Sequence, residues 1–138
     1  MRKLVSVREV ESFGLYDITV ENDHCFELSN GVIAHNSMYP KAIVSGGCVV
    51  AGTLIQTTSG LKPIEEIIVG EKVVTSYGEN NVSHTWNPDT LEEGEPECYE
   101  VEFKDGHKVT CSYKHKFLIN NAWIEAKDLI AGMDCQTI

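Results

Sequence analysis

The sequence has few basic residues, no long apolar segment and no pair of cysteines spaced as in a zinc site. Lys and Arg number 11 against 21 Asp and Glu, and the formal net charge is -10. This charge would repel a phosphate backbone, so nucleic-acid binding is not expected. No apolar stretch is long enough for a membrane helix, and residues 1–14 lack the apolar core of a signal peptide. We therefore expect a cytoplasmic protein that binds neither nucleic acid nor a membrane.

The number and spacing of the cysteines argue against a disulfide framework or a metal site. Their number is odd and no two have C-x-x-C spacing: Cys25, Cys48, Cys98, Cys111 and Cys135. We therefore expect no metal and no other cofactor. A buried, unreactive thiol is the ordinary expectation for a cysteine. Cys48 is the exception, because it follows Ser45-Gly46-Gly47, and we predict an accessible and reactive thiol there.

Alternation typical of β-strands dominates the 138 residues. It occurs in KLVSVREVE, GLYDITVE, EKVVTSY, CYEVEFKDGHKVTC and HKFLIN. Asp105-Gly106 between two alternating runs predicts a hairpin, and Val32-Ile33-Ala34 predicts a short buried strand. Only KPIEEIIVG and WIEAKDLIAG predict short helical turns. The pattern predicts a mostly β fold with one or two short helices.

Two segments lack this pattern. Residues 89–97 are acidic and contain Gly and Pro, which predicts a solvated loop. Residues 37–47 end in Gly-Gly between two well-patterned regions, which predicts a linker.

An internal repeat relates residues 16–33 to residues 99–124. Both segments begin with Tyr, an acid and a branched aliphatic residue, and both contain His-x-Phe. The alignment pairs His24 with His115, Phe26 with Phe117, Asn30 with Asn121 and Ile33 with Ile124. Chance similarity between β-hairpins is one explanation, and two structurally equivalent halves are the other.

Asn36 could break the peptide bond that follows it. The side-chain nitrogen of an asparagine can attack its own backbone carbonyl, which closes a succinimide and releases the next residue. The reaction needs a general acid for the leaving amine, and His35 and His24 could supply it. The alternative is an ordinary His-Asn pair in a surface loop.

Cys48 could attack the carbonyl of Gly47 and convert that amide into a thioester. Ser112 could hold the scissile carbonyl, and His115 could protonate the leaving nitrogen. The hydroxyl of Ser37 could then accept the acyl group. The alternative is a structural serine and a core histidine, but together with Asn36 these residues form one reaction scheme.

These motifs resemble those of inteins, the protein-splicing elements of the Hedgehog/intein (HINT) fold. CVVAGTLIQTTSGLKPIEEI (48–67) resembles the N-terminal block of the family, and GHKVTCSYKHKFLI (106–119) resembles its second block. YDITVENDHCFELSNGVIAHNS (16–37) resembles the two C-terminal blocks followed by the first C-extein residue. The resemblance implies a compact, horseshoe-like domain of two halves related by a pseudo-two-fold axis.

The resemblance also implies a role for each residue. Cys48 is the first nucleophile, and Ser112 and His115 activate the Gly47–Cys48 bond. Asp17 steers the first nucleophile and its release. His24 and His35 assist cyclisation of Asn36, and Ser37 is the acceptor nucleophile. Ser112 departs from the family, which usually has Thr at this position, but it keeps the hydroxyl.

The order of the segments is inverted, as in a permuted or engineered split intein. Residues 1–36 resemble the C-terminal intein segment, 37–47 lie where exteins belong, and 48–138 resemble the N-terminal segment. We expect 1–36 and 48–138 to form one domain, as a monomer or as a domain-swapped dimer, whose partners are its own flanking segments. Splicing would then release a cyclic peptide of residues 37–47. The alternatives are cleavage at one junction only and a β-rich binding module without autoprocessing.

Overall fold

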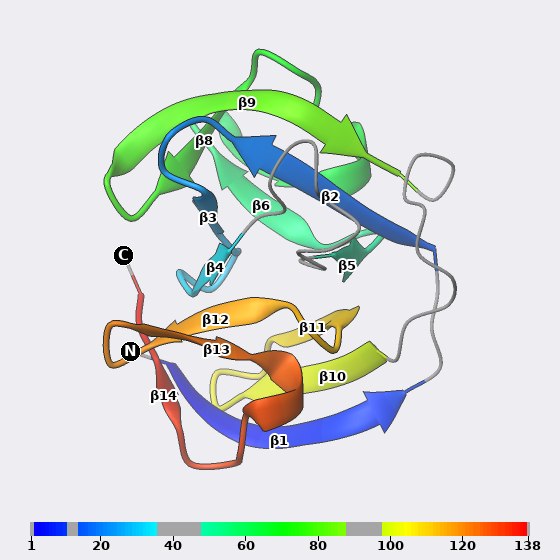
Figure 1. Ribbon diagram of the computed structural model, residues 1–138, viewed down its shortest axis with the longest axis vertical. Coiled ribbons are helices and arrows are strands. Elements are labelled where there is room, and N and C mark those ends of the chain that lie inside the picture. Colours follow the sequence, from blue (N-terminus) through cyan, green and yellow to red (C-terminus); the bar gives the residue numbers. More distant parts are fainter. Residues whose placement is uncertain (1, 11–13, 36–47, 88–97, 138) are drawn as a thin grey trace.

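The computed structural model describes residues 2–10, 14–35, 48–87 and 98–137. These residues form a mostly β fold with antiparallel strand pairing (Figure 1), which confirms the predicted fold class. The predicted loop at 89–97 and the predicted linker at 37–47 lie outside the described residues. No helix among the described residues is long and apolar enough to cross a membrane.

The strands form a long sheet and a short sheet. The long sheet, in spatial order, consists of β14 (Asp134–Cys135), β1 (Arg2–Val10), β10 (Cys98–Phe103), β11 (Lys108–Ser112), β5 (Val49–Val50), β2 (Leu15–Val20), β9 (Gly78–Trp86), β8 (Lys72–Thr75), β6 (Leu54–Thr57) and β7 (Gly60–Pro63). The short sheet consists of β13 (Ala122–Glu125), β12 (Lys116–Ile119), β4 (Ile33–His35) and β3 (Cys25–Glu27).

Three local predictions are confirmed. The Asp105-Gly106 turn joins β10 to β11, and Gly106 has a φ of 90°, which favours glycine because other residues are strained there. Val32, Ile33 and Ala34 are buried, and the last two belong to β4. The two segments with helical periodicity each form a single 3₁₀ turn, η1 (Ile64–Glu66) and η2 (Ala126–Asp128).

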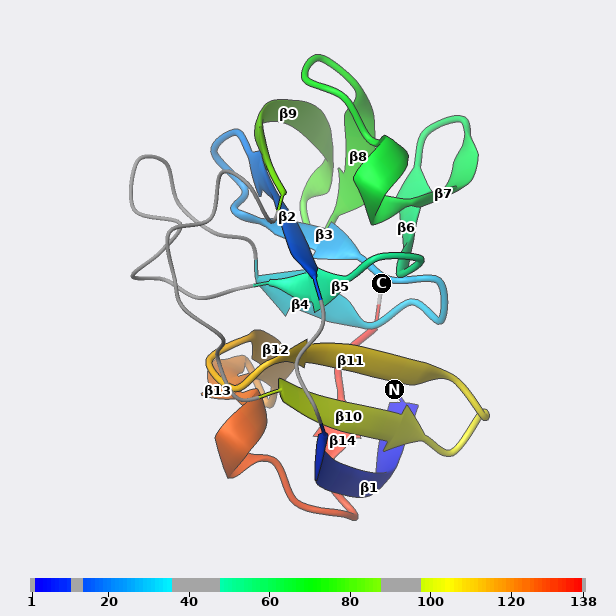
Figure 2. The same cartoon turned by 90° about the vertical axis from the view of Figure 1, so that its right-hand side faces the viewer.

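Apart from the β3–β4 hairpin, the strands of the two sheets form two equivalent halves. The first half comprises β2 and β5–β9, and the second half comprises β1 and β10–β14. They meet where Val49 of β5 pairs with Cys111 of β11. Tyr16 of β2 then pairs with Val49, just as Tyr99 of β10 pairs with Cys111. Figures 1 and 2 show the first half above and the second half below.

The correspondence continues outward from this pair. A register shift interrupts the pairing of β2 with β9, and another interrupts the pairing of β10 with β1 at the matching place. The backbone N–H of Ile64 donates to Thr53, as that of Ala126 donates to His115, at 2.9 and 2.8 Å. The two halves therefore share the order of four strands, β5-β2-β9-β8 and β11-β10-β1-β14, with equivalent register and turns. They differ beyond these strands, because β6 and β7 extend the long sheet whereas β12 and β13 belong to the short sheet.

This symmetry confirms one part of the predicted repeat and corrects the other. YDITV in β2 is equivalent to YEVEF in β10, as predicted. The equivalent of residues 115–124 is 53–62, however, and not 24–33, so the pairing of His24 with His115 was wrong. The β3–β4 hairpin has a register of its own, with Phe26 opposite Ala34, whereas Phe117 lies opposite Ile124.

The β3–β4 hairpin lies between the two halves (Figure 1). Leu28, just after β3, forms a bridge to Ile55 of β6, and Ala34 of β4 pairs with Phe117 of β12. Ile55 and Phe117 occupy equivalent positions, so the hairpin contacts both halves in the same way.

The core is continuous through both halves and the hairpin. Its largest fully buried side chains include Phe26, Phe103, Phe117, Ile18 and Ile55. Each such side chain contributes about 1.5–3 kcal/mol when it leaves water. The core therefore contains residues from both described segments, from Leu4 to Ala34 and from Val49 to Cys135.

Candidate active site

Cys48 and Ser112 lie opposite each other where the two halves meet. The Ser112 N–H donates to the Cys48 carbonyl at 2.9 Å, and the Cys48 N–H donates to the Ser112 Oγ at 3.3 Å. Both residues are almost fully buried. The Ser112 hydroxyl therefore contacts the peptide bond that Cys48 shares with the residue before it.

Asp17 lies in β2, the strand on the other side of β5. Tyr16 pairs with Val49, so Asp17 is one residue along β2 from the pair that adjoins Cys48. Its side chain is 1% exposed, and its Oδ1 accepts a hydrogen bond from the Ile18 N–H at 2.7 Å. A carboxyl group is thus held at the strand that flanks the thiol.

His115 follows Ser112 in a tight turn between β11 and β12. Its N–H donates to the Ser112 carbonyl at 3.0 Å, and its imidazole is completely buried. The ring packs edge-on against Phe117, with 4.9 Å between the ring centroids. This turn places an imidazole beside the serine that contacts Cys48.

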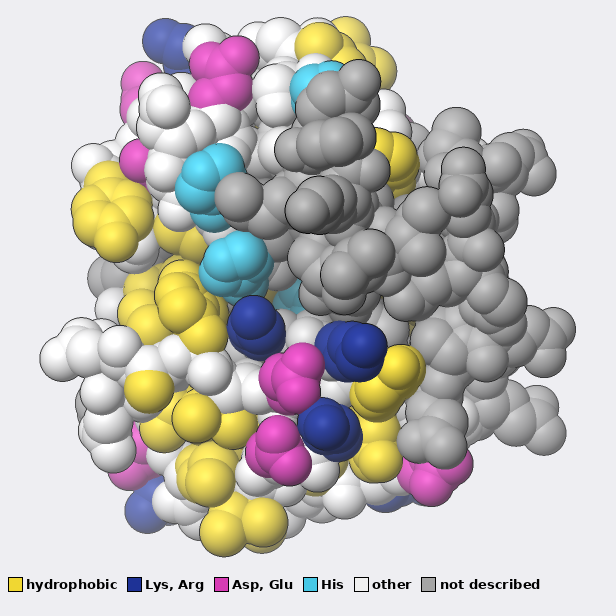
Figure 3. Space-filling model, viewed as in Figure 1, with side chains coloured by type: hydrophobic (Ala, Val, Ile, Leu, Met, Phe, Trp, Pro, Cys, Tyr) yellow, Lys and Arg dark blue, Asp and Glu magenta, His cyan; other side chains and the backbone are white. Residues whose placement is uncertain are grey.

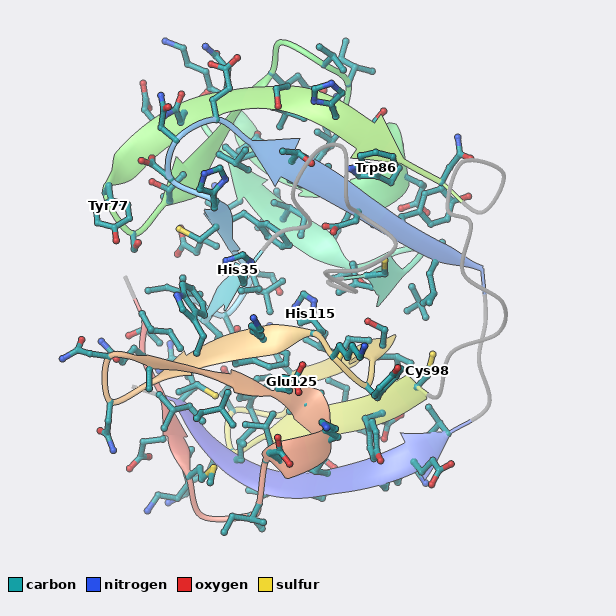
Figure 4. The ribbon with its side chains drawn as sticks, viewed as in Figure 1. His35, Tyr77, Trp86, Cys98, His115 and Glu125 are labelled. Carbon is teal, nitrogen blue, oxygen red and sulfur yellow. The ribbon has the colours of Figure 1, made fainter. Side chains whose placement is uncertain are left out.

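His35 reaches the same region from the β3–β4 hairpin. It is the last residue of β4, and its ring packs edge-on against Trp123 of β13 at 5.0 Å. Figure 4 shows His35 and His115 where the two halves meet, and Figure 3 shows histidine side chains gathered there on the surface. The pairing of Ala34 with Phe117 joins β4, which ends at His35, to β12, which begins directly after His115.

His24 lies at the start of the same hairpin. It has a φ of 52°, and the next residue, Cys25, pairs with His35. Among the described residues its buried Nδ1 has no hydrogen-bond partner. The hairpin therefore carries both histidines that were predicted to assist Asn36.

Three predicted site residues, Asn36, Ser37 and Gly47, lie outside the described residues. Asn36 directly follows His35 in the sequence, and Gly47 directly precedes Cys48. The described part of the site therefore contains Asp17, His24, His35, Cys48, Ser112 and His115.

The prediction of an accessible Cys48 was wrong. The residue is 2% exposed and packs with Leu15 and Cys98 in a small apolar cluster. The glycines before it suggested an exposed thiol, but the pairing of β5 with β2 and β11 encloses it. Access to this thiol is therefore limited to groups that the fold itself brings to it.

Sequence reasoning missed three neighbours of the site. Trp86 pairs with Asp17, and its indole N–H donates to the Thr19 Oγ1 at 3.0 Å. Trp123 packs on His35, and Cys98 pairs with Ser112. A search for aromatic residues at equivalent repeat positions would not have found Trp86, because its counterpart in β1 is Arg8.

Burial raises the pKa of two cysteine thiols in the second half, Cys111 and Cys135. It strongly raises the pKa of Cys111, with a further increase from Cys98, and it raises the pKa of Cys135 to about 12, helped by Asp134. Both thiols therefore stay protonated at neutral pH, which makes them poor nucleophiles.

The described residues contain no group of three or more His, Cys, Asp or Glu side chains arranged to hold a metal ion. Comparisons with models of known families and with curated proteins find no match to this chain. The Ser112 hydroxyl contacts the Cys48 N–H, His115 lies in the turn that follows Ser112, and Asp17 lies on the strand adjacent to β5.

Proposed function

We propose that this chain is a permuted intein that carries out autocatalytic splicing. The observation that carries the proposal is the pair of hydrogen bonds between Cys48 and Ser112, with His115 in the next turn. An acyl shift needs a nucleophile, a group that polarises the scissile carbonyl and an acid for the leaving nitrogen. These three residues are of the right types to supply them.

The first step is an N-to-S acyl shift. The Cys48 sulfur bonds to the Gly47 carbonyl carbon, the C–N bond breaks, and the thiol proton is transferred so that the nitrogen leaves as an amine. His115 is the proton donor for that nitrogen, and the Asp17 carboxylate accepts the proton of the thiol.

The later steps use the other junction. The Ser37 hydroxyl attacks the thioester and returns the Cys48 thiol. Asn36 then cyclises, assisted by His24 and His35, and the Asn36–Ser37 bond breaks. The freed Ser37 amine attacks the Gly47 ester, and a cyclic peptide of residues 37–47 results.

The interleaving of strands supports a single domain made of residues 1–36 and 48–138. Strand β2 lies between β5 and β9, and β1 lies between β10 and β14. Spent protein should therefore keep both segments together after release of the peptide. We expect a monomer, and size-exclusion chromatography would distinguish it from a domain-swapped dimer.

Intact-mass measurement of the incubated chain tests the proposal. We expect the linear chain to give a cyclic peptide of residues 37–47 and two fragments, 1–36 ending in succinimide and 48–138. Asn36→Ala should stop release of the cycle but not thioester formation. Hydrolysis at one junction without the cycle would instead identify a cleavage-only domain, and an inert chain would favour a binding module.

A further inference from the structure

A pocket lies at the C-terminal end of β5 and the N-terminal end of β11. Cys48 and Ser112 lie at the opposite ends of these two strands. Three turns form the pocket: Leu28–Asn30 of the β3–β4 hairpin, Gly52–Leu54 after β5, and residues 107–109 at the start of β11. Its volume is about 180 Å³. Figure 2 shows the β3–β4 and β10–β11 turns together on the right of the molecule.

The symmetry of the fold explains why a pocket occurs there. Thr53 occupies the place in the first half that His115 occupies in the second, because each accepts the equivalent backbone hydrogen bond. The pocket is therefore the two-fold counterpart of the candidate active site, but the residues used there for catalysis are replaced. Its lining residues include no cysteine.

Asn30 supplies an unused hydrogen-bond donor to this pocket. The residue is 5% exposed, its Oδ1 accepts from the Val32 N–H at 3.3 Å, and its backbone carbonyl accepts from Arg2 at 3.0 Å. Its buried Nδ2 has no acceptor among the described residues. Because buried amide groups are normally paired, this donor indicates a ligand that brings an acceptor oxygen.

The charge of the lining favours an anionic acceptor. Lys108 lines the pocket, and no Asp or Glu does. Two carboxylates hydrogen-bond to lining residues, Asp105 to the His107 ring at 3.2 Å and Glu65 to the Gly52 N–H at 2.9 Å. Asp105 also pairs with Arg2 at 3.2 Å, whereas the Gly52 N–H leaves the charge of Glu65 in place. A carboxylate ligand therefore depends on Lys108 for its countercharge.

The remaining lining is apolar, from Leu28, Leu54 and Val109. We propose that this pocket binds a small organic carboxylate, with its oxygens on Asn30 and Lys108 and a short aliphatic body against these three side chains. The volume fits a ligand of a few heavy atoms, below the roughly 300 Å³ of pockets for drug-sized molecules. The proposal does not depend on splicing, because it concerns binding alone.

Titration with sodium butyrate tests the proposal. The probe is added to the full chain carrying Cys48→Ala and Asn36→Ala, and the backbone amides of Gly52 and Thr53, which line the pocket, are followed by NMR together with the Asn30 side-chain amide. We expect saturable shifts with a Kd of about 1–10 mM, as befits a ligand of six heavy atoms. 1-Butanol, which lacks the carboxylate, and inorganic phosphate, which lacks the aliphatic body, should each bind at least fivefold more weakly than butyrate.

Two variants and a control make the test specific. Lys108→Gln should weaken butyrate at least fivefold, and Asn30→Asp should abolish binding because it places a carboxylate against the ligand. Lys72→Gln, an exposed lysine on β8, is the matched control and should bind like the parent. Shifts that do not saturate, equal affinity in Lys108→Gln, or equal affinity for 1-butanol or phosphate would overturn the assignment.

Discussion

The two halves of the molecule share a backbone plan but differ in the side chains at four key positions. Where the second half has Ser112 and His115, the first half has Val50 and Thr53. Where the first half has Asp17, buried opposite Trp86, the second half has Glu100, which pairs with Arg8 at 2.9 Å. The fourth position is Cys48 itself, whose counterpart in the second half is Thr110.

The strand arrangement that the two halves share is therefore not sufficient to form the candidate active site. Each half contributes part of the constellation, the thiol and the carboxyl from one and the hydroxyl and the imidazole from the other. They meet on only one side of the Val49–Cys111 pair. Substitutions at equivalent positions of the two halves therefore separate chemistry from structure.

The largest effect is expected from His115→Gln, compared with Thr53→Ala at the equivalent position. Loss of a positioned general acid lowers a rate by about 10²–10⁴-fold, so thioester formation at Cys48 should fall by this amount. Thr53→Ala should leave the rate within about threefold, since this hydroxyl only donates to the Val50 carbonyl at 2.7 Å. Mass spectrometry of thiol-treated protein measures both rates, and equal losses would contradict the assignment.

A smaller effect is expected from Ser112→Ala. The Ser112 Oγ accepts a hydrogen bond from the N–H of the scissile bond, and removal of one preorganised hydrogen-bonding group at a reacting bond costs about 10²-fold or more in rate. Ser112→Thr keeps the hydroxyl and should restore most of the activity. If Ser112→Ala reacts as fast as Ser112→Thr, the hydroxyl has no role in the reaction, and the contacts with Cys48 are structural.

A third comparison concerns stability rather than chemistry. In the first half Lys62 and Glu71 form an ion pair at 2.7 Å, whereas the second half has the apolar Ile124 and Met133 at these places. Burial alone would raise the pKa of Glu71, but hydrogen bonds from Lys62 and the Ile68 N–H outweigh it and lower the pKa below the usual 4.5. The pair therefore stabilises the fold above about pH 4.5, and this stability is lost as the pH falls through the lowered pKa.

The double substitution Lys62→Ile, Glu71→Met tests this by copying the second half. It should remove this part of the acid sensitivity and change the free energy of unfolding by about 1 kcal/mol or less. Urea unfolding at pH 6 and pH 3.5 measures the difference. An unchanged pH dependence would show that the ion pair contributes nothing to it.

The last comparison concerns stability at the pair where the halves meet. Cys111→Val makes this residue identical to its partner Val49 and should change stability by less than about 1.5 kcal/mol. Cys111→Ser buries a hydroxyl instead and should cost about 1–3 kcal/mol. Urea unfolding compares the two variants, and a larger loss for valine would show that the thiol itself is needed.

Much of the fold could be predicted from the sequence, because alternation and turn residues act locally. The Asp105-Gly106 hairpin, the short buried strand predicted at 32–34 and the equivalence of β2 with β10 were all visible in the sequence. The burial of Cys48 was not, because it depends on two strands distant in sequence, β2 and β11. The segment equivalent to residues 115–124 was missed because residues 24–26 share the His-x-Phe motif with residues 115–117. Residues 53–62, the true equivalent, share the strand and turn pattern of 115–124 but not this motif.

The site could be predicted by residue type but not by geometry. The sequence pointed to Ser112 and Cys48 as partners, and the structure places them in hydrogen-bond contact. Trp86 and Cys98 could not be anticipated, because only the cross-strand register brings them beside Asp17 and Ser112.

Thiol-induced cleavage at the Gly47–Cys48 bond is the most direct test of the proposed acyl shift to Cys48. The Asn36→Ala chain, in which splicing cannot finish, is incubated with an excess of a small thiol and analysed by intact mass. If Cys48 forms a thioester with Gly47, two fragments should result: 1–47 as a thioester with the added thiol, and 48–138. Adding Cys48→Ala should abolish them, whereas Thr110→Ala, the equivalent change in the other half, should not. An intact chain, or equal cleavage in the Cys48→Ala variant, would contradict the account.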